Sequence, residues 1–213
     1  MTLAAVRALV AGAILVAGAT LLVGCTDASR ATIGPSGAPA SAVPTARATS
    51  VAPTETAPAV TVGPGQTTAE DPTLLAILPA TVAGATISRE PASFPEALHD
   101  RSFVANVDRA VFAVVADGDD LASGVVAHLR AGAWSDKFFG DWRASYDDGA
   151  CAQSGGIVAH AETTSGGRTV YVTTCGGGLR VYHAYVASKG VVVSILSTGP
   201  RLFGDLLMAG IRG

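Results

Sequence analysis

The chain has 213 residues, and its 14 basic and 17 acidic side chains give a net charge of −3. A nucleic-acid-binding protein needs a basic face to displace counterions from phosphates, and a protein held to anionic lipids by charge needs a polybasic patch. The charge balance argues against both, so we expect no nucleic-acid partner. The length allows one ordinary domain with additional segments, whereas two full domains would be cramped.

The first 24 residues have the character of an export signal. Arg7 and the amino terminus supply positive charge, and an apolar run follows over residues 8–23. As a helix this run would reach about 24 Å, which is less than the roughly 30 Å hydrocarbon core of a bilayer. Its length therefore favours a cleaved signal peptide over a permanent membrane span.

The apolar run ends in Leu22-Val23-Gly24-Cys25, which resembles the lipobox of bacterial membrane lipoproteins. The resemblance implies that residues 1–24 are a lipoprotein signal peptide and that Cys25 carries lipid as the first residue of the mature protein. Two acyl chains would anchor it stably, at about 0.8 kcal/mol per buried methylene. We thus expect a protein anchored to the cell membrane through acylated Cys25, with the bilayer as its partner and its domain outside the cytoplasm. The alternative is an uncleaved helix in which Cys25 is incidental.

Residues 25–70 differ sharply in composition from the rest of the chain. They are rich in Ala, Thr, Ser, Pro and Gly, hold six of the eleven prolines and contain no aromatic residue. Such a segment cannot bury enough apolar surface to offset the entropy lost on ordering. We predict a lipidated, disordered linker over residues 25–70, followed by a globular domain over residues 71–213.

The first part of this domain contains few regular elements on sequence grounds. Asp71 is a good helix cap and Pro72 fits a first helical turn, so residues 72–78 should form a short helix. Its inward side chains should be those of three leucines, Leu74, Leu75 and Leu78. Residues 85–89 resemble a strand, and residues 91–108 are expected to be irregular.

A hairpin and a central helix follow. Residues 109–116 and 121–130 are β-rich and flank an acidic turn over residues 117–120. Ser135 can cap a helix over residues 136–148, which Gly149 is placed to end. One face of this helix should be aromatic, because four such residues fall at spacings of three and four: Phe138, Phe139, Trp142 and Tyr146.

Four more strands are predicted, separated by glycine-rich turns of hairpin length. The last of them is apolar on both faces, so structure should cover it on both sides. Pro200 should begin a closing helix, whose buried stripe is Leu202, Phe203, Leu206, Leu207 and Ile211. The fold class predicted is α+β, a mainly antiparallel sheet of about six or seven strands with helices packed on it. The four strands cover residues 156–162, 168–175, 179–187 and 191–197.

The lipobox accounts for one of the three cysteines. The other two, Cys151 and Cys175, form an even pair, which outside the cytoplasm predicts a disulfide. Two buried free thiols are the alternative. A redox-active pair is disfavoured because Cys-x-x-Cys spacing is absent.

The sequence offers no convincing catalytic, cofactor or metal site. His128, His160 and His183 each lie on a predicted strand and could converge on a metal across the sheet. Their spacing does not support this, and three separate histidines are the simpler interpretation. The acidic pair Asp147-Asp148 is interpreted as a helix end. We therefore expect neither a metal nor a cofactor.

Two classes of function remain open. The first is a non-catalytic binding or envelope-interaction module, which should carry a modest apolar cleft without convergent titratable groups. The second is a small cell-envelope hydrolase, which should hold a nucleophile, a base and an orienting group together in a cleft. No recognised catalytic motif is present, and this favours the first class. A plain spacer in the envelope is a third possibility.

Overall fold

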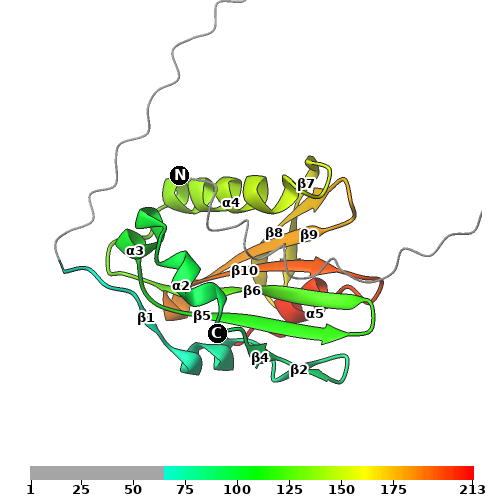
Figure 1. The fold of residues 1–213 in the computed structure, drawn as a ribbon, viewed down its shortest axis with the longest axis horizontal. Helices are drawn as coiled ribbons and strands as arrows, with labels where there is room; N and C mark the ends of the chain where they lie inside the picture. The colour runs from blue at the N-terminus through cyan, green and yellow to red at the C-terminus, as the bar shows by residue number, and fades with distance from the viewer. Residues whose placement is uncertain (1–64) are drawn as a thin grey trace, which may run out of the picture. The chain divides into compact units, whose positions relative to one another are not determined.

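The computed structural model describes residues 65–213. The predicted signal peptide, Cys25 and most of the predicted linker lie outside the described residues. Within the described part, a mainly antiparallel sheet carries helices on both of its faces (Figure 1), which confirms the predicted α+β class.

The sheet has eight strands, seven of which follow the order β1-β5-β6-β10-β9-β8-β7. The remaining strand, β4, pairs with β5, and every pairing is antiparallel except that of β1 with β5. The strands are β1 (Ala69–Glu70), β4 (Ser88–Arg89), β5 (Val107–Asp117), β6 (Asp120–Leu129), β7 (Ile157–Ser165), β8 (Arg168–Cys175), β9 (Arg180–Val186) and β10 (Val191–Thr198).

Helices and a small ribbon complete the described residues. The ribbon consists of β2 (Thr81–Val82) and β3 (Ala85–Thr86) and forms a sheet of its own. The predicted strand over residues 85–89 is thus divided between β3 and β4. The helices are η1 (Pro72–Ile77), α2 (Ser93–Ala97), α3 (Arg101–Asn106), α4 (Asp136–Cys151), η2 (Ala187–Lys189) and α5 (Phe203–Ala209).

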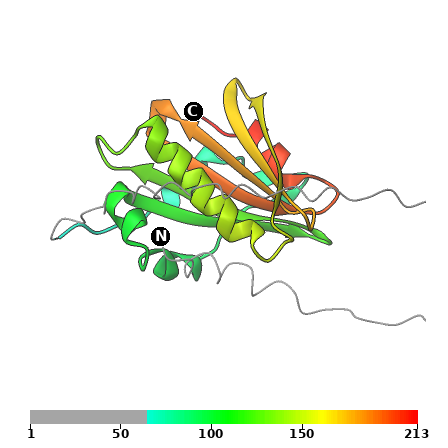
Figure 2. The same ribbon diagram turned by 90° about the horizontal axis from the view of Figure 1, so that it is seen from above.

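Strand β10 is the centre of the sheet and is buried on both faces, as its sequence predicts. It pairs with β6 on one side and with β9 on the other. On one face, Val192 packs into an apolar cluster beneath α2, α3 and α4. On the other face, Val193 and Ile195 pack against η1 and α5. Figure 2 shows α4 lying diagonally across the strands.

Helix α4 begins as predicted but continues beyond its predicted end. The Ser135 hydroxyl accepts a hydrogen bond from the backbone N–H of Phe138 at 3.0 Å, which caps the first turn. Gly149 lies inside the helix, which ends at Cys151, so the predicted stop is wrong. The reason is packing: Ala150 and Cys151 are both buried and keep the last turn on the sheet.

Residues 91–108 are not irregular, contrary to the prediction, because they contain the short helices α2 and α3. The Asp100 carboxylate accepts hydrogen bonds from the backbone N–H groups of Ser102 and Phe103 and so caps α3. The Glu90 carboxylate does the same for the residues that begin α2. Helices of one or two turns are too short to show the apolar periodicity on which the prediction relied.

Regular structure in the described residues begins before residue 71, the predicted start of the domain. Thr68 is buried, and its hydroxyl donates to the carbonyl of Val107 at 2.7 Å. Strand β1 then adds Ala69 and Glu70 to the edge of the sheet. Hydrogen bonds to the backbone of β5 therefore extend the fold into a segment whose composition resembles the linker.

The closing helix begins later than predicted. The backbone N–H of Arg201 and its guanidinium both bind the Asp120 carboxylate at 2.7 Å, which holds the preceding residues in a turn. Helix α5 therefore begins at Phe203 instead of Pro200, and Leu202 and Leu206 are exposed rather than buried. The buried stripe is completed by another residue, Met208.

Replacement of glycine by alanine should have opposite effects on stability at two positions of the fold. A Cβ atom at Gly124 in β6 would collide with the backbone of Ser194 and Ile195 on β10, whereas one at Gly140 in α4 would meet nothing. We expect Gly124→Ala to cost about 3 kcal/mol or more of unfolding free energy, through overpacking in the sheet. Gly140→Ala should gain about 0.5–1 kcal/mol, because alanine loses less backbone entropy in a helix. Urea denaturation of both variants measures these changes, and a similar loss in both would contradict the packing described.

Candidate functional site

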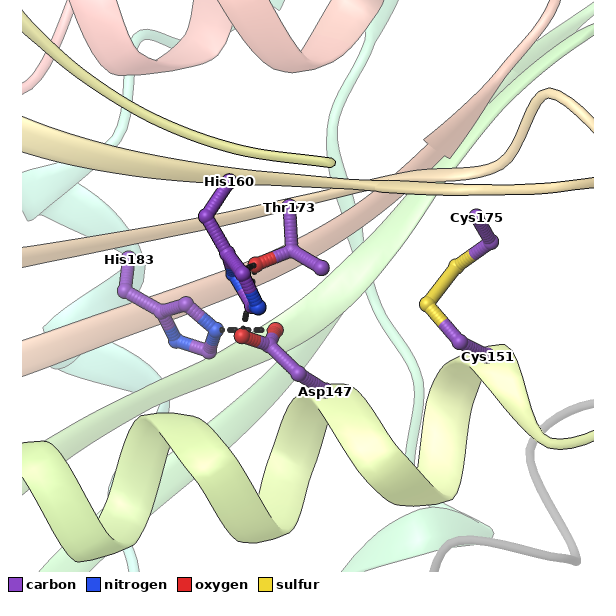
Figure 3. Close-up of a disulfide and its surroundings, with 6 residues drawn as sticks. All are labelled: Asp147, Cys151, His160, Thr173, Cys175 and His183. Carbon is purple, nitrogen blue, oxygen red and sulfur yellow. Dashed lines mark hydrogen bonds and ion pairs between the residues drawn. A yellow bond between two sulfur atoms is a disulfide. The ribbon is translucent and has the colours of Figure 1, made fainter. Parts of the chain in front are cut away.

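Four buried polar side chains meet beneath α4. They come from α4 and from the three strands it crosses, and each is at most 3% exposed. Figure 3 shows three of them together with the nearby disulfide. We call this set the buried polar network; its members are Asp147, Thr173, His183 and Ser194.

Asp147 is the centre of the buried polar network. One of its carboxylate oxygens lies 2.9 Å from Nε2 of His183, and the other accepts the hydroxyl hydrogen of Thr173 at 2.6 Å. A buried carboxylate needs such partners, because an unpartnered charge would lose its hydration without compensation.

The hydrogen bonds continue from His183 to the opposite side of the network. Nδ1 of His183 lies 2.8 Å from the Ser194 hydroxyl, which accepts a hydrogen bond from Nε1 of Trp142 at 2.9 Å. The Ser194 hydroxyl hydrogen is then available for Nδ1, and Nε2–H of a neutral His183 donates to Asp147. Both ring nitrogens of His183 thus have a hydrogen-bond partner when the imidazole is neutral.

The charge state of His183 follows from its burial. Burial lowers the pKa of the imidazole below its usual value, and the Arg143 guanidinium lowers it further. The Asp147 carboxylate opposes this shift in pKa through its hydrogen bond and its charge, but desolvation is the larger effect. His183 is therefore a neutral imidazole at neutral pH.

Two of the three histidines considered from the sequence come together at this network. His160 is exposed on β7, and its Nδ1 lies 3.0 Å from the Thr173 hydroxyl, which in turn donates to Asp147 (Figure 3). His128 lies apart on β6, where its Nδ1 is 2.6 Å from the Asp108 carboxylate. Across residues 65–213, no group of three or more His, Cys, Asp or Glu side chains could hold a metal ion.

The order Asp147–His183–Ser194 has the connectivity of a catalytic triad. Two features distinguish it from a working one. The ring presents Nδ1 to the serine and Nε2 to the carboxylate, the reverse of the serine-protease arrangement. In addition, Ser194 is 0% exposed and its oxygen already accepts the Trp142 indole hydrogen. A carbonyl substrate has no access to this hydroxyl in the structure.

The predicted disulfide is present and lies one turn of α4 beyond Asp147. Cys151 at the end of α4 is bonded to Cys175 at the end of β8, and both residues are buried (Figure 3). The two cysteines are 24 residues apart in the sequence. A loop of this length restricts the unfolded chain by about 3.5 kcal/mol in the chain-entropy treatment. The disulfide therefore ties the end of α4 to the end of β8.

An open cavity lies on the other side of the sheet, away from the buried polar network. It has a volume of about 410 Å³, within the roughly 300–1,000 Å³ typical of small-molecule sites. It is formed by η1, by residues of β5, β6 and β10, by the end of η2 and by the last residues of the chain. Its lining is Thr73, Leu74, Ala76, Ile77, Arg109, His128, Lys189, Val191, Arg212 and Gly213.

Comparison of the chain with protein-family models, with characterised proteins and with solved structures returned no match. No helix within residues 65–213 is long and apolar enough to cross a membrane.

The sequence predicted neither Asp147 nor Ser194 as part of a site. Asp147 was assigned to a helix end, but it is one of the buried residues of α4 and lies two turns after Phe139, on the same side of the helix. That spacing is the signal that could have identified it. Ser194 had a comparable signal, since it is a polar residue within a strand that is otherwise apolar on both faces.

The neutral state of His183 makes a prediction about pH. An unfolded histidine takes up a proton near pH 6.5, whereas buried His183 does not, so acid favours the unfolded chain. The contribution of His183 to stability is complete above about pH 6.5 and falls below it, by at most about 1.4 kcal/mol per pH unit. We expect this slope to be smaller in His183→Gln.

Urea denaturation between about pH 7 and pH 5 measures the slope. His99→Gln is the matched control, because His99 is highly exposed and lies outside the buried polar network. NMR titration of His183 in the folded protein gives a second reading. Equal pH slopes of the unfolding free energy in wild type and His183→Gln, together with an ordinary titration of His183, would contradict the assignment of a buried neutral imidazole.

Proposed function

We propose that this chain is a bacterial membrane lipoprotein whose domain is a non-catalytic binding module held outside the cytoplasm. The lipobox-like residues that end in Cys25 support the anchor. The Cys151–Cys175 disulfide supports the location, because such bonds persist in oxidising compartments outside the cytoplasm.

The observation that carries the non-catalytic part is the separation of the open cavity from the triad-like residues. Ser194 and His183 are both fully buried beneath α4. The lining of the cavity contains a single side-chain hydroxyl, that of Thr73, and it donates to the Asp71 carboxylate at 2.6 Å. A cavity without an activated nucleophile suits binding better than hydrolysis.

The connectivity of Asp147, His183 and Ser194 favours a second candidate, a small cell-envelope hydrolase. For Ser194 to attack a substrate, the hydrogen bond from the Trp142 indole to the Ser194 hydroxyl would have to break, and α4 would have to move away from the sheet. The disulfide at Cys151 opposes that movement at one end of the helix. These contacts make hydrolysis the weaker proposal.

Lipidation at Cys25 has a direct test. Wild-type protein should incorporate labelled palmitate and fractionate with membranes, and Cys25→Ser should incorporate no palmitate. Globomycin, which blocks lipoprotein signal peptidase, should leave the full-length precursor in wild type. A mature protein that is free in the medium and begins at another residue would contradict the anchor.

Reactivity of Ser194 separates the two candidate functions. The folded domain should not react with a fluorophosphonate probe, because the hydroxyl is buried and bonded to Trp142. Ser194→Ala is the control that identifies any labelling as specific. Labelling of wild type that is lost in Ser194→Ala, together with ester hydrolysis, would establish the hydrolase instead.

A further inference from the structure

The cavity beside η1 combines an apolar wall with cationic side chains. Leu74, Ile77 and Val191 are buried side chains that line it. They also belong to the apolar core on this side of the sheet, so the wall is held rigidly by packing. An occupant with a hydrocarbon portion would find a preformed surface there.

The cations around this wall differ in whether they already have a partner. Arg109 is held by the Asp71 carboxylate at 2.9 Å, and His128 by Asp108 at 2.6 Å. Lys189 and Arg212 line the same cavity, and neither forms a side-chain ion pair within the part of the chain that the structure describes.

The lining contains no acidic side chain, although the chain carries a net negative charge overall. The local balance of charge is therefore cationic against an acidic background. This contrast points to an anionic group at the rim.

We propose that the cavity binds a single-chain amphiphile with an anionic head, of which a fatty carboxylate is the simplest example. The hydrocarbon chain packs on Ala76 and on the accessible edges of Leu74 and Ile77, and the carboxylate faces Lys189 and Arg212. The inference rests on the proposed binding function and specifies the class of ligand for it. A small anion without a hydrocarbon chain would leave the apolar wall exposed to water. An uncharged hydrocarbon would leave Lys189 and Arg212 without an ion-pair partner.

The test measures binding to the mature chain carrying Cys25→Ser, which can be studied without detergent. Calorimetry with octanoate, decanoate and dodecanoate should show affinity rising about tenfold for each two methylenes until the cavity is filled. At the same chain length, decanoate should bind better than decanol, and decyltrimethylammonium should bind worst.

Two variants assign the binding to this cavity. Ala76 is exposed on η1 and lines the cavity, so Ala76→Trp should fill it and weaken decanoate binding about tenfold or more without disturbing the core. The double variant Lys189→Glu with Arg212→Glu should weaken decanoate binding about tenfold and strengthen decyltrimethylammonium binding. Damage to the fold would weaken both ligands, so this reversal of preference is specific.

Arg101→Glu is the matched control, because Arg101 is an exposed cation on α3 that does not line the cavity. It should leave all affinities unchanged. Equal affinity for decanoate and decanol, binding that Ala76→Trp does not reduce, or no binding of any amphiphile would overturn the inference. None of these results would alter lipidation of Cys25 or labelling of Ser194, so the proposed function is judged separately.

Discussion

The buried carboxylate of Asp147 is the interaction on which the arrangement of α4 and the sheet depends. A charge at this depth is tolerated only when hydrogen-bond donors replace the water it has lost. The donors come from β8 and β9, through the Thr173 hydroxyl and the His183 ring. Helix α4 can therefore occupy only the position in which its carboxylate faces both strands.

Two further contacts fix the helix along its length. Trp142 donates its indole hydrogen to Ser194 on β10, one turn before Asp147, and Cys151 is bonded to Cys175 one turn after it. Along α4, a neutral hydrogen bond at Trp142 is therefore followed by the hydrogen bonds of the Asp147 carboxylate and then by the disulfide at Cys151. Apolar packing supplies most of the driving force for such a layer, but it is non-directional, and these bonds determine register.

The sequence predicted most of the fold where local chemistry and tertiary packing agree. Glycine-rich turns separated the strands of the second half correctly, and the doubly apolar pattern of β10 predicted cover on both faces. Prediction was wrong where distant contacts decide the local structure. Asp120 holds Arg201 and delays α5, and Val107 accepts a hydrogen bond from Thr68 and extends the domain into linker-like sequence. Neither contact can be inferred from neighbouring residues.

The site was less predictable than the fold for a related reason. The disulfide followed from counting cysteines, whereas the buried polar network depends on register across three strands. His183 lies opposite Ser194 on β10, and only that pairing places the imidazole between a hydroxyl and a carboxylate. The spacing of the three histidines disfavoured a shared metal site, but it could not show where each one lies. The register places His183 against Asp147 and His160 against Thr173, and leaves His128 at the cavity.

The two polar regions of the domain differ in a way that bears on function. The polar hydrogens of His183 and Thr173 in the buried polar network, and that of the neighbouring Trp142 indole, are all directed to protein acceptors. Satisfied groups of this kind specify a structure, and they have little to offer a substrate. Around the cavity, Lys189 and Arg212 stand beside an apolar wall without an acidic partner in the described residues. Binding energy is available where interactions are incomplete, which supports our proposal that the cavity, rather than the triad-like residues, recognises another molecule.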